Sequence, residues 1–248
     1  LVTGPTGSGK STTLYASLNE VDRSEKKIIT VEDPIEYNLS GINQCQVNER
    51  IGLTFPGILR AVLRQDPNII VIGEIRDVET AEIAVTSALT GHLVMSTLHT
   101  NDAPSAITRL VDMGIKPFLI SSSIQAILAQ RLVRVICPKC KVPYKVEKDV
   151  LESLNVDSID LENMEFCHGT GCDYCNKTGY RGRKPIFEFM SMNTELRDAI
   201  FNKMPTNELR KIAHSNGMTT LAEDGLRLAR AHVTTLEEVM RITSLDSM

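Results

Sequence analysis

The chain begins with LVTGPTGSGKST, residues 1–12, and this stretch decides the fold class. Residues 4–11 match the pattern G-x-x-x-x-G-K-[S/T] at every fixed position. The apolar residues before the pattern predict the end of a buried strand, and the apolar spacing of residues 11–20 predicts a helix directly after it. A strand, a glycine-rich loop and a helix in this order are typical of a phosphate-binding loop, in which backbone N–H groups and the positive end of the helix face an anion.

The loop predicts which groups hold a nucleotide and its metal ion. The Lys10 ammonium would reach the β- and γ-phosphates, and the Ser11 hydroxyl would bind Mg²⁺. The alternative is a glycine-rich turn that binds nothing, and the order of strand, loop and helix argues against it. The other nucleotide-binding candidates are the neighbours in the same segment: Gly4, Pro5, Thr6, Gly7, Ser8, Gly9 and Thr12.

The composition narrows the class of protein. The chain has 248 residues, of which 42% are hydrophobic and 23% charged, a balance typical of globular proteins. The net charge of −4 argues against a surface dedicated to nucleic acid. No apolar run approaches the ~20 residues that span a bilayer and no signal peptide is visible, so we expect any membrane role to be peripheral. Because little chain precedes the loop to supply its strand, we also expect a C-terminal piece of a longer protein.

Hydrophobic periodicity divides the chain into three predicted parts. Residues 1–135 predict an α/β core with a truncated first strand, because alternating strand and helix patterns are typical of a parallel sheet with helices on both faces. Residues 136–183 predict an irregular module, and residues 184–248 a helical subdomain. The predicted strands are 27–31, 69–72 and 93–97, and the predicted helices are 11–20, 56–64, 78–90, 103–113, 194–203, 206–216, 220–230 and 235–242.

Carboxylates follow two of the predicted strands. Glu74 comes directly after the apolar run 69–72, and Glu32 and Asp33 follow the run 27–31. Because ligands of open α/β sheets lie at the carboxyl ends of the strands, Glu74 is placed to contact Mg²⁺ through water or to take a proton from an attacking water. Many phosphate-loop enzymes have Asp where this chain has Gly73, so the Glu32–Asp33 pair is the candidate second acid. The alternative for that pair is a solvated acidic turn.

Two histidines bracket the predicted strand 93–97. His99 follows the strand, where a γ-phosphate is expected, and its hydrogen bonds would change when that phosphate is lost. His92 precedes the strand and is a less direct candidate. For both, the alternative is a structural histidine in the core.

Two C-x-x-C pairs predict a metal site in the module. Cys137 with Cys140, and Cys172 with Cys175, each form a short turn that presents two thiolates, and four thiolates satisfy tetrahedral Zn²⁺ without an open position for chemistry. The alternatives are disulfides, which are unexpected without secretion, and a redox motif, which explains one pair only.

The remaining cysteines have other interpretations. Cys167 with His168 is an alternative source of one of the four metal ligands. Cys45 lies in a strand-like run outside the module and is expected to be a packed thiol. We expect Gly169, Gly171 and Gly179 to adopt positive φ in the turns.

Four segments together resemble one family. GPTGSGKST, TVEDPIEY, RQDPNIIVIGEIRD and GHLVMSTLHTNDAPSAITRL are similar, in order and spacing, to the Walker A, Asp-box, Walker B and His-box motifs of the secretion ATPases of type II secretion and type IV pilus assembly. The resemblance covers essentially the whole chain, and the four-cysteine module is similar to the assembly members rather than to the pilus retraction ATPase.

The resemblance implies a RecA-like domain that hydrolyses ATP with Mg²⁺, in a homo-hexameric ring with ATP held between subunits. By position, Glu74 is the expected catalytic base, Glu32 supports metal or water, and His92 and His99 take the His-box positions. A further N-terminal domain would supply arginines to the nucleotide, and no local arginine is assigned that role; the local candidates for charge compensation are Arg50, Arg60, Arg64 and Arg76.

The resemblance also implies a biological setting. We expect a type II secretion ATPase at the cytoplasmic face of the inner membrane, with platform and adaptor proteins of that membrane as partners, no nucleic acid and no membrane span of its own. The alternatives are a pilus-assembly ATPase, a RecA-like DNA motor, and an assembly platform that binds ATP without turning it over.

Overall fold

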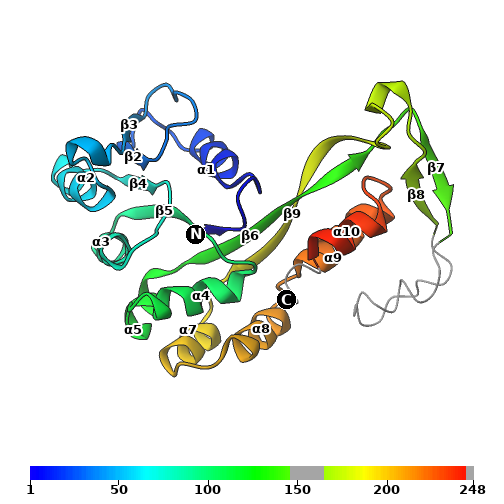
Figure 1. Ribbon diagram of the computed structural model, residues 1–248. Coiled ribbons are helices and arrows are strands. Elements are labelled where there is room, and N and C mark those ends of the chain that lie inside the picture. The colour runs from blue at the N-terminus through cyan, green and yellow to red at the C-terminus, as the bar shows by residue number, and fades with distance from the viewer. Residues whose placement is uncertain (146–164, 244–248) are drawn as a thin grey trace. The chain divides into compact units, whose positions relative to one another are not determined.

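Figure 1 shows the computed structural model of the chain, which describes residues 1–145 and 165–243. The chain forms two compact units, which are described separately below. Unit 1 comprises Leu1–Ala129 and Phe189–Met218, and unit 2 comprises Gln130–Glu188 and Thr219–Met248. Both units are therefore discontinuous in sequence, and the predicted division at residues 135 and 183 stays a prediction.

The sheet of unit 1 is built from short strands that pair in parallel. They are β1 (Val2–Thr3), β2 (Ile28–Glu32), β3 (Asn43–Gln46), β4 (Ile69–Ile72) and β5 (Leu93–Leu98). The order across the sheet is β3-β2-β4-β5-β1-β6-β9, in which β6 is Ala126–Ile136 and β9 is Tyr180–Ser191. The three predicted strands are confirmed to within a residue at each end.

Helices cover both faces of this sheet, as the sequence predicts. Every residue of β2 and β4 is buried, on both alternating sides of each strand. On one face, α1 packs Leu14 and Leu18 against Ile28, Ile69 and Val71. The helices of unit 1 are α1 (Lys10–Asn19), α2 (Phe55–Val62), α3 (Val78–Leu89), α4 (Ala103–Asp112), α5 (Pro117–Ser123), α7 (Thr194–Phe201) and α8 (Thr206–Ser215).

Side-chain caps explain where several helices of unit 1 begin. The carboxylate of Asp77 accepts from the Thr80 N–H at 2.8 Å, and that of Asp102 accepts from the Ser105 N–H at 2.7 Å. These bonds satisfy N–H groups that have no partner inside the helix. They explain why the predicted starts at residues 78 and 103 are confirmed.

The described part of unit 2 combines strands with two amphipathic helices. The strands β7 (Lys141–Tyr144) and β8 (Phe166–Gly169) pair antiparallel in a small sheet. The helices are α9 (Leu221–Arg230) and α10 (Leu236–Thr243), and α9 begins with a reciprocal capping box between Thr220 and Glu223. No described helix of the protein is both long enough and apolar enough to span a bilayer.

The strands of residues 126–191 are the main difference from the predicted organisation. The sequence predicts an irregular module over residues 136–183, whereas its described part contains β7, β8 and the beginning of β9, and the long strand β6 leads into it. The sequence of β9 contains Gly182 and Pro185 and is charged in its first half, so its pattern of alternating burial is confined to residues 186–190. That mixture hides a strand from a periodicity argument.

Candidate functional site

The glycine-rich loop has the backbone conformation that an anion site needs. Gly7 and Gly9 adopt φ of 77° and 91°, a conformation that residues with a Cβ atom disfavour. Gly9 is the residue directly before α1, so the loop ends on the N-terminal end of that helix. The Lys10 Nζ donates to the carbonyl oxygens of Gly4 at 2.8 Å and Pro5 at 3.0 Å, so the ammonium lies over the loop. Ser11 and Thr12 are exposed on the first turn of α1.

Parallel pairing brings the predicted acids and one histidine to the same edge of the sheet. In the register, Val31 pairs with Ile72, Ile72 pairs with Ser96, and Thr97 pairs with Val2. The residues that follow these positions are therefore neighbours at the carboxyl ends of the strands: Glu32 as the last residue of β2 and Asp33 after it, Glu74 after β4, His99 after β5 and Gly4 after β1. This is the edge at which open α/β sheets bind ligands.

A hydroxyl links the tip of β5 to the strand that precedes the loop. Thr3 Oγ1 donates to the Leu98 carbonyl oxygen at 3.1 Å and accepts from the Thr100 N–H at 2.9 Å. The backbone on both sides of His99 is thus bonded to the residue directly before Gly4. This contact holds His99 beside the loop. No local motif marks Thr3, because its role depends on the pairing of β1 with β5.

Glu74 lies at the centre of a small charged group. Its side chain is 14% exposed, it forms an ion pair with Arg76, and its Oε2 lies 3.5 Å from the His99 Nε2. The Arg76 guanidinium also lies 3.7 Å from the Asp33 carboxylate. Arg76 therefore bridges the acids that follow β4 and β2, a role that only the register of the sheet reveals.

The surroundings of His99 favour its neutral form. Burial lowers the pKa of His99 below its usual value, the Lys10 ammonium lowers it further, and the Glu74 carboxylate does not offset them. A neutral imidazole beside Glu74 can donate or accept a hydrogen bond without adding charge to the site.

His92 lies at the other end of the same strand. Its Nδ1 is 3.0 Å from the Ser87 carbonyl oxygen and 3.2 Å from Thr90 Oγ1, in the turn between α3 and β5. It lines an open cleft together with Pro67 and Asn68, which precede β4. Within one subunit the structure therefore separates His92 from the other predicted site residues, because a six-residue strand is roughly 20 Å long.

The two acids at the carboxyl end of β2 have different environments. Glu32 is only 4% exposed and accepts hydrogen bonds from Tyr15, Thr30 and Gln44, whereas the Asp33 side chain is 42% exposed. The peptide bond between Asp33 and Pro34 is cis. Asp33 therefore faces the edge of the site, and Glu32 lies beneath it.

The structure gives a reason for Gly73. A Cβ at this position would lie 3.3 Å from the Glu32 Cα and 3.3 Å from the Val31 carbonyl oxygen. The tips of β2 and β4 approach too closely for an aspartate here without displacing the backbone. The carboxylates at this edge of the sheet are therefore those of Glu74, Glu32 and Asp33.

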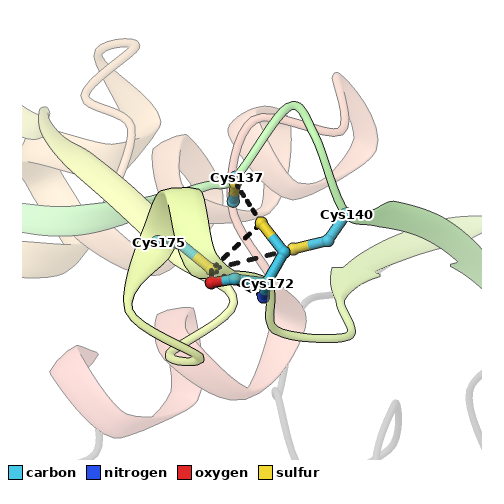
Figure 2. Close-up of side chains that lie close together, drawn as sticks. All are labelled: Cys137, Cys140, Cys172 and Cys175. Carbon is cyan, nitrogen blue, oxygen red and sulfur yellow. Dashed lines mark hydrogen bonds between the residues drawn. The ribbon is translucent and has the colours of Figure 1, made fainter.

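Four cysteines of unit 2 converge in a single cluster (Figure 2). Cys137 and Cys140 follow β6, whereas Cys172 precedes the short 3₁₀ turn Asp173–Cys175 and Cys175 ends it. The Sγ atoms lie 3.8 Å apart for Cys137 and Cys172, 3.9 Å for Cys140 and Cys175, and 3.7 Å for Cys172 and Cys175. Among the described residues, this is the group of His, Cys, Asp and Glu side chains that can hold a metal ion.

Backbone N–H groups surround one of these sulfurs. Cys175 Sγ accepts from the N–H of Cys172 at 3.2 Å and from that of Gly179 at 3.3 Å. Burial raises the pKa of the Cys175 thiol, but these donors outweigh burial and bring the pKa to about 6. Burial raises the pKa of Cys140 to about 11. The cluster is therefore already arranged to stabilise at least one thiolate.

The glycines of the module correct one expectation. Gly171 and Gly179 have positive φ of 86° and 76°, as expected, but Gly169 does not. Gly169 is needed for close approach instead, because a Cβ there would lie 2.1 Å from the Gly179 carbonyl oxygen.

The other two cysteines and His168 lie outside the cluster. Cys167 is a buried residue of β8, and the ring of His168 packs edge-on against Tyr144 with centroids 5.0 Å apart. Cys45 lies in β3 as a half-buried free thiol.

Comparison with known proteins shows the family. The family model described as type II/IV secretion system protein matches residues 1–241. The type II secretion system ATPase E of Vibrio cholerae is 54% identical over 98% of this chain and 48% of its own length. The type IV pilus assembly ATPase PilB of Thermus thermophilus is 50% identical over 98% of this chain and 27% of its own length. The chain thus spans about half, or less, of the curated relatives that it matches.

Solved structures agree with this result. The chain superposes with a TM-score of 0.72 on the pilus retraction motor PilT with bound ADP, at 31% identity over 100% of this chain and 62% of the other. It superposes with a TM-score of 0.70 on the ATPase DotB of Legionella pneumophila, at 25% identity over 98% of this chain and 59% of the other. The loop, the acids of the sheet edge and the family model agree: this chain belongs to the type II/IV secretion system protein family.

Proposed function

We propose that this chain hydrolyses ATP as the motor part of a type II secretion system, driving pseudopilus assembly and protein export. The observation that carries the proposal is the phosphate-type loop with Lys10 lying over it, at the sheet edge that also carries Glu74. The 31% identity to PilT, whose structure holds ADP, supports nucleotide binding at this loop.

The chemistry is in-line attack of water on the γ-phosphate. The loop N–H groups and Lys10 bind the phosphates, and Ser11 holds Mg²⁺, which when bound neutralises charge on the phosphate oxygens. Glu74 aligns and deprotonates the attacking water. Neutral His99, next to Glu74, hydrogen-bonds near the γ-phosphate and senses its loss. We assign His92 no role in this site, because it lies at the other end of β5.

Three relatives support secretion over pilus assembly. Type II secretion proteins from Vibrio cholerae and Pseudomonas aeruginosa are 52–54% identical, against 50% for the pilus-assembly ATPases of Thermus thermophilus and Myxococcus xanthus. Other type II secretion proteins are 49% identical, so the two groups overlap. By analogy we propose a homo-hexamer at the cytoplasmic face of the inner membrane, with ATP between subunits and with platform and adaptor proteins as partners. The pilus-assembly ATPase is the second candidate.

We also propose that the four cysteines hold a structural Zn²⁺. Tetrahedral zinc with Zn–S bonds of about 2.3 Å separates its sulfurs by about 3.8 Å. Three of the six sulfur pairs lie 3.7, 3.8 and 3.9 Å apart, and all four sulfurs lie within 4.8 Å of one another, which fits a tetrahedral site. Four protein ligands leave no position for a substrate, so the metal stabilises unit 2 and does no chemistry.

Two substitutions separate binding from turnover. Glu74→Gln should keep ATP binding and lower phosphate release by about 100-fold or more, because the amide is not a base. Lys10→Ala should lose both. Glu208→Gln, on the exposed surface of α8, is the control and should leave both unchanged. Unimpaired phosphate release by Glu74→Gln protein would remove the assignment of the base.

The same assays distinguish the alternatives. ATP binding without phosphate release, in the wild-type chain and in a longer form with the N-terminal domain that the family resemblance implies, would indicate an assembly platform rather than a motor. Phosphate release that DNA stimulates, and that high salt abolishes, would indicate a DNA motor instead.

A further inference from the structure

A buried carboxylate lies beneath the nucleotide site, and three polar groups hold it. Glu32 is 4% exposed. It lies on the face of β2 that α1 covers, because Ile28, Thr30 and Glu32 share one face of the strand and Ile28 packs against α1. Tyr15 Oη donates to its Oε2, whereas Thr30 Oγ1 and Gln44 Nε2 both donate to its Oε1, the latter at 3.1 Å. The three donors come from α1, β2 and β3, so this carboxylate connects three elements.

The partners of Glu32 in the described part of the chain are neutral. Neither lysine nor arginine forms an ion pair with it there, so hydroxyl and amide donors alone compensate its burial. A buried acceptor that loses its donor costs stability and changes position or protonation to recover a partner. The orientation of Glu32 therefore depends on each donor.

Tyr15 is the donor that connects Glu32 to the phosphate-binding helix. It follows Ser11 by four residues, so the two side chains lie on one face of α1, one turn apart. Tyr15 is 2% exposed, and its ring packs edge-on against Tyr37 with centroids 4.7 Å apart and an interplanar angle of 84°. Burial and the Glu32 carboxylate raise the pKa of Tyr15 above its usual value, so its hydroxyl stays a donor.

Gln44 holds the opposite side of the carboxylate and the segment that follows it. Its Nε2 also donates to the Tyr37 carbonyl oxygen at 3.2 Å, and its Oε1 accepts from the Leu39 N–H at 2.7 Å. The segment after β2 is thus bonded to the same network as Glu32. Asp33, which begins that segment, lies 3.7 Å from the Arg76 that pairs with Glu74.

We propose that Tyr15 is a positioning residue for the magnesium side of the nucleotide site, acting through Glu32. Its hydroxyl fixes the tip of β2, and with it the acids at the sheet edge, relative to the first turn of α1 that carries Ser11. This inference rests on the proposed function. In this assignment Glu32 connects helix and strand, while the exposed Asp33 and the partly buried Glu74 face the nucleotide.

A double-mutant cycle on turnover tests the connection. Tyr15→Phe keeps the ring and removes the hydroxyl, and Tyr37→Phe is the matched control, because Tyr37 is 54% exposed. Tyr15→Phe should lower kcat by about 10- to 100-fold with the KM for ATP nearly unchanged, since the loop and Lys10 are intact. In the Glu32→Gln background the same change should add little further loss, because the two groups act as one unit. Tyr37→Phe should resemble wild type.

A packing role alone gives a different pattern. It would lower the melting temperature of Tyr15→Phe but leave kcat within about twofold of wild type below that temperature, or give losses that multiply in the double mutant. Either result would overturn the proposal.

A binding measurement keeps the test independent of turnover. Calorimetric titration with ATP, with and without Mg²⁺, gives the gain in affinity that the metal provides. Tyr15→Phe should reduce that gain and leave metal-free ATP affinity unchanged, whereas an unchanged gain would contradict the positioning role. If the wild-type chain shows metal-dependent binding without phosphate release, the proposed hydrolysis fails and this result still decides the role of Tyr15.

Discussion

The nucleotide end of unit 1 and the cysteine cluster of unit 2 hold their functional groups by different means. At the nucleotide end, the side chains follow strands such as β2 and β4, whose residues are all buried, so the apolar core supports the edge. Around the cysteines, β7 has no buried residue and the backbone turns at glycines that pack against one another. A site of the first kind exists before its ligand binds, whereas a site of the second kind depends on its ligand for stability.

Removing the metal should produce the largest effect, and only in unit 2. Chelation, or Cys172→Ser, takes away binding free energy that in small zinc modules is on the order of 10 kcal/mol. We expect unit 2 to lose its cooperative melting transition while unit 1 still binds ATP. Calorimetric melting with metal analysis measures this, and one zinc per chain is expected in the wild type.

Two results would contradict this difference between the units. If chelation leaves both transitions unchanged, the cysteine cluster does not depend on a metal. If it abolishes ATP binding as well, the nucleotide end does not stand on its own core.

A buried ion-pair network should give the next largest effect. The Glu238 side chain is fully buried and pairs with Arg134 Nη2 at 2.7 Å and Arg241 Nε at 2.8 Å. Glu238→Ala removes a buried acceptor whose arginine partners are 45% and 53% exposed, so water solvates the guanidinium groups that remain. The loss of these charged hydrogen bonds should destabilise unit 2 by about 2–4 kcal/mol in urea unfolding. Glu208→Gln, which breaks an exposed pair, is the control and should change stability by less than about 1 kcal/mol. Equal effects would contradict the importance of burial.

The same carboxylate should make unit 2 sensitive to acid. Burial raises the pKa of Glu238, but the hydrogen bonds from Arg241 and Arg134 outweigh burial and lower the pKa from 4.5 to about 2. The folded state therefore binds fewer protons than the unfolded state, so this contribution is present above pH 4.5 and is lost as the pH falls toward 2.

Urea unfolding of wild type and Glu238→Gln at a series of pH values below 6.0 measures this contribution. The stability of the wild type should fall more steeply with acid than that of the variant. Parallel curves would show that Glu238 titrates normally in the folded protein.

The smallest effect concerns the close approach of two glycines. Gly169→Ala places a Cβ against the Gly179 carbonyl oxygen and should cost about 1–3 kcal/mol through forced displacement of the backbone. Gly182→Ala is the comparison, because its φ is 83° but nothing lies within 4 Å of the added atom. A lowered metal affinity for Gly169→Ala alone is expected. Equal metal affinities of the two variants would remove close packing as the cause.

Local patterns predicted much of the fold. The run 69–72 is apolar and β-branched throughout, and Asp77 and Asp102 cap the helices that start after them, so strand and helix bounds are nearly correct. The sequence did not predict β9, because a charged, glycine-containing segment conceals its alternating burial. It did not predict the pairing of β6 and β9 in the sheet either, because that pairing joins residues far apart in sequence, which local patterns do not reveal.

The candidate site divides in the same way. The loop, Glu74 and the two C-x-x-C pairs are contiguous motifs, so the sequence predicts them. Tyr15 and Gln44 are 17 residues before and 12 residues after Glu32, and only the packing of α1 and β3 brings them to it. The separation of His92 from His99 follows from the length of β5, which the predicted strand already implied.

Calorimetric titration of the wild-type chain and of Lys10→Ala with ATP and Mg²⁺ tests whether the glycine-rich loop binds a nucleotide. We expect saturable, Mg²⁺-dependent binding of one nucleotide per wild-type chain. We expect no binding by Lys10→Ala protein whose melting temperature is unchanged. Absence of any heat of binding for the folded wild type, or equal binding by both proteins, would contradict a nucleotide site at this loop.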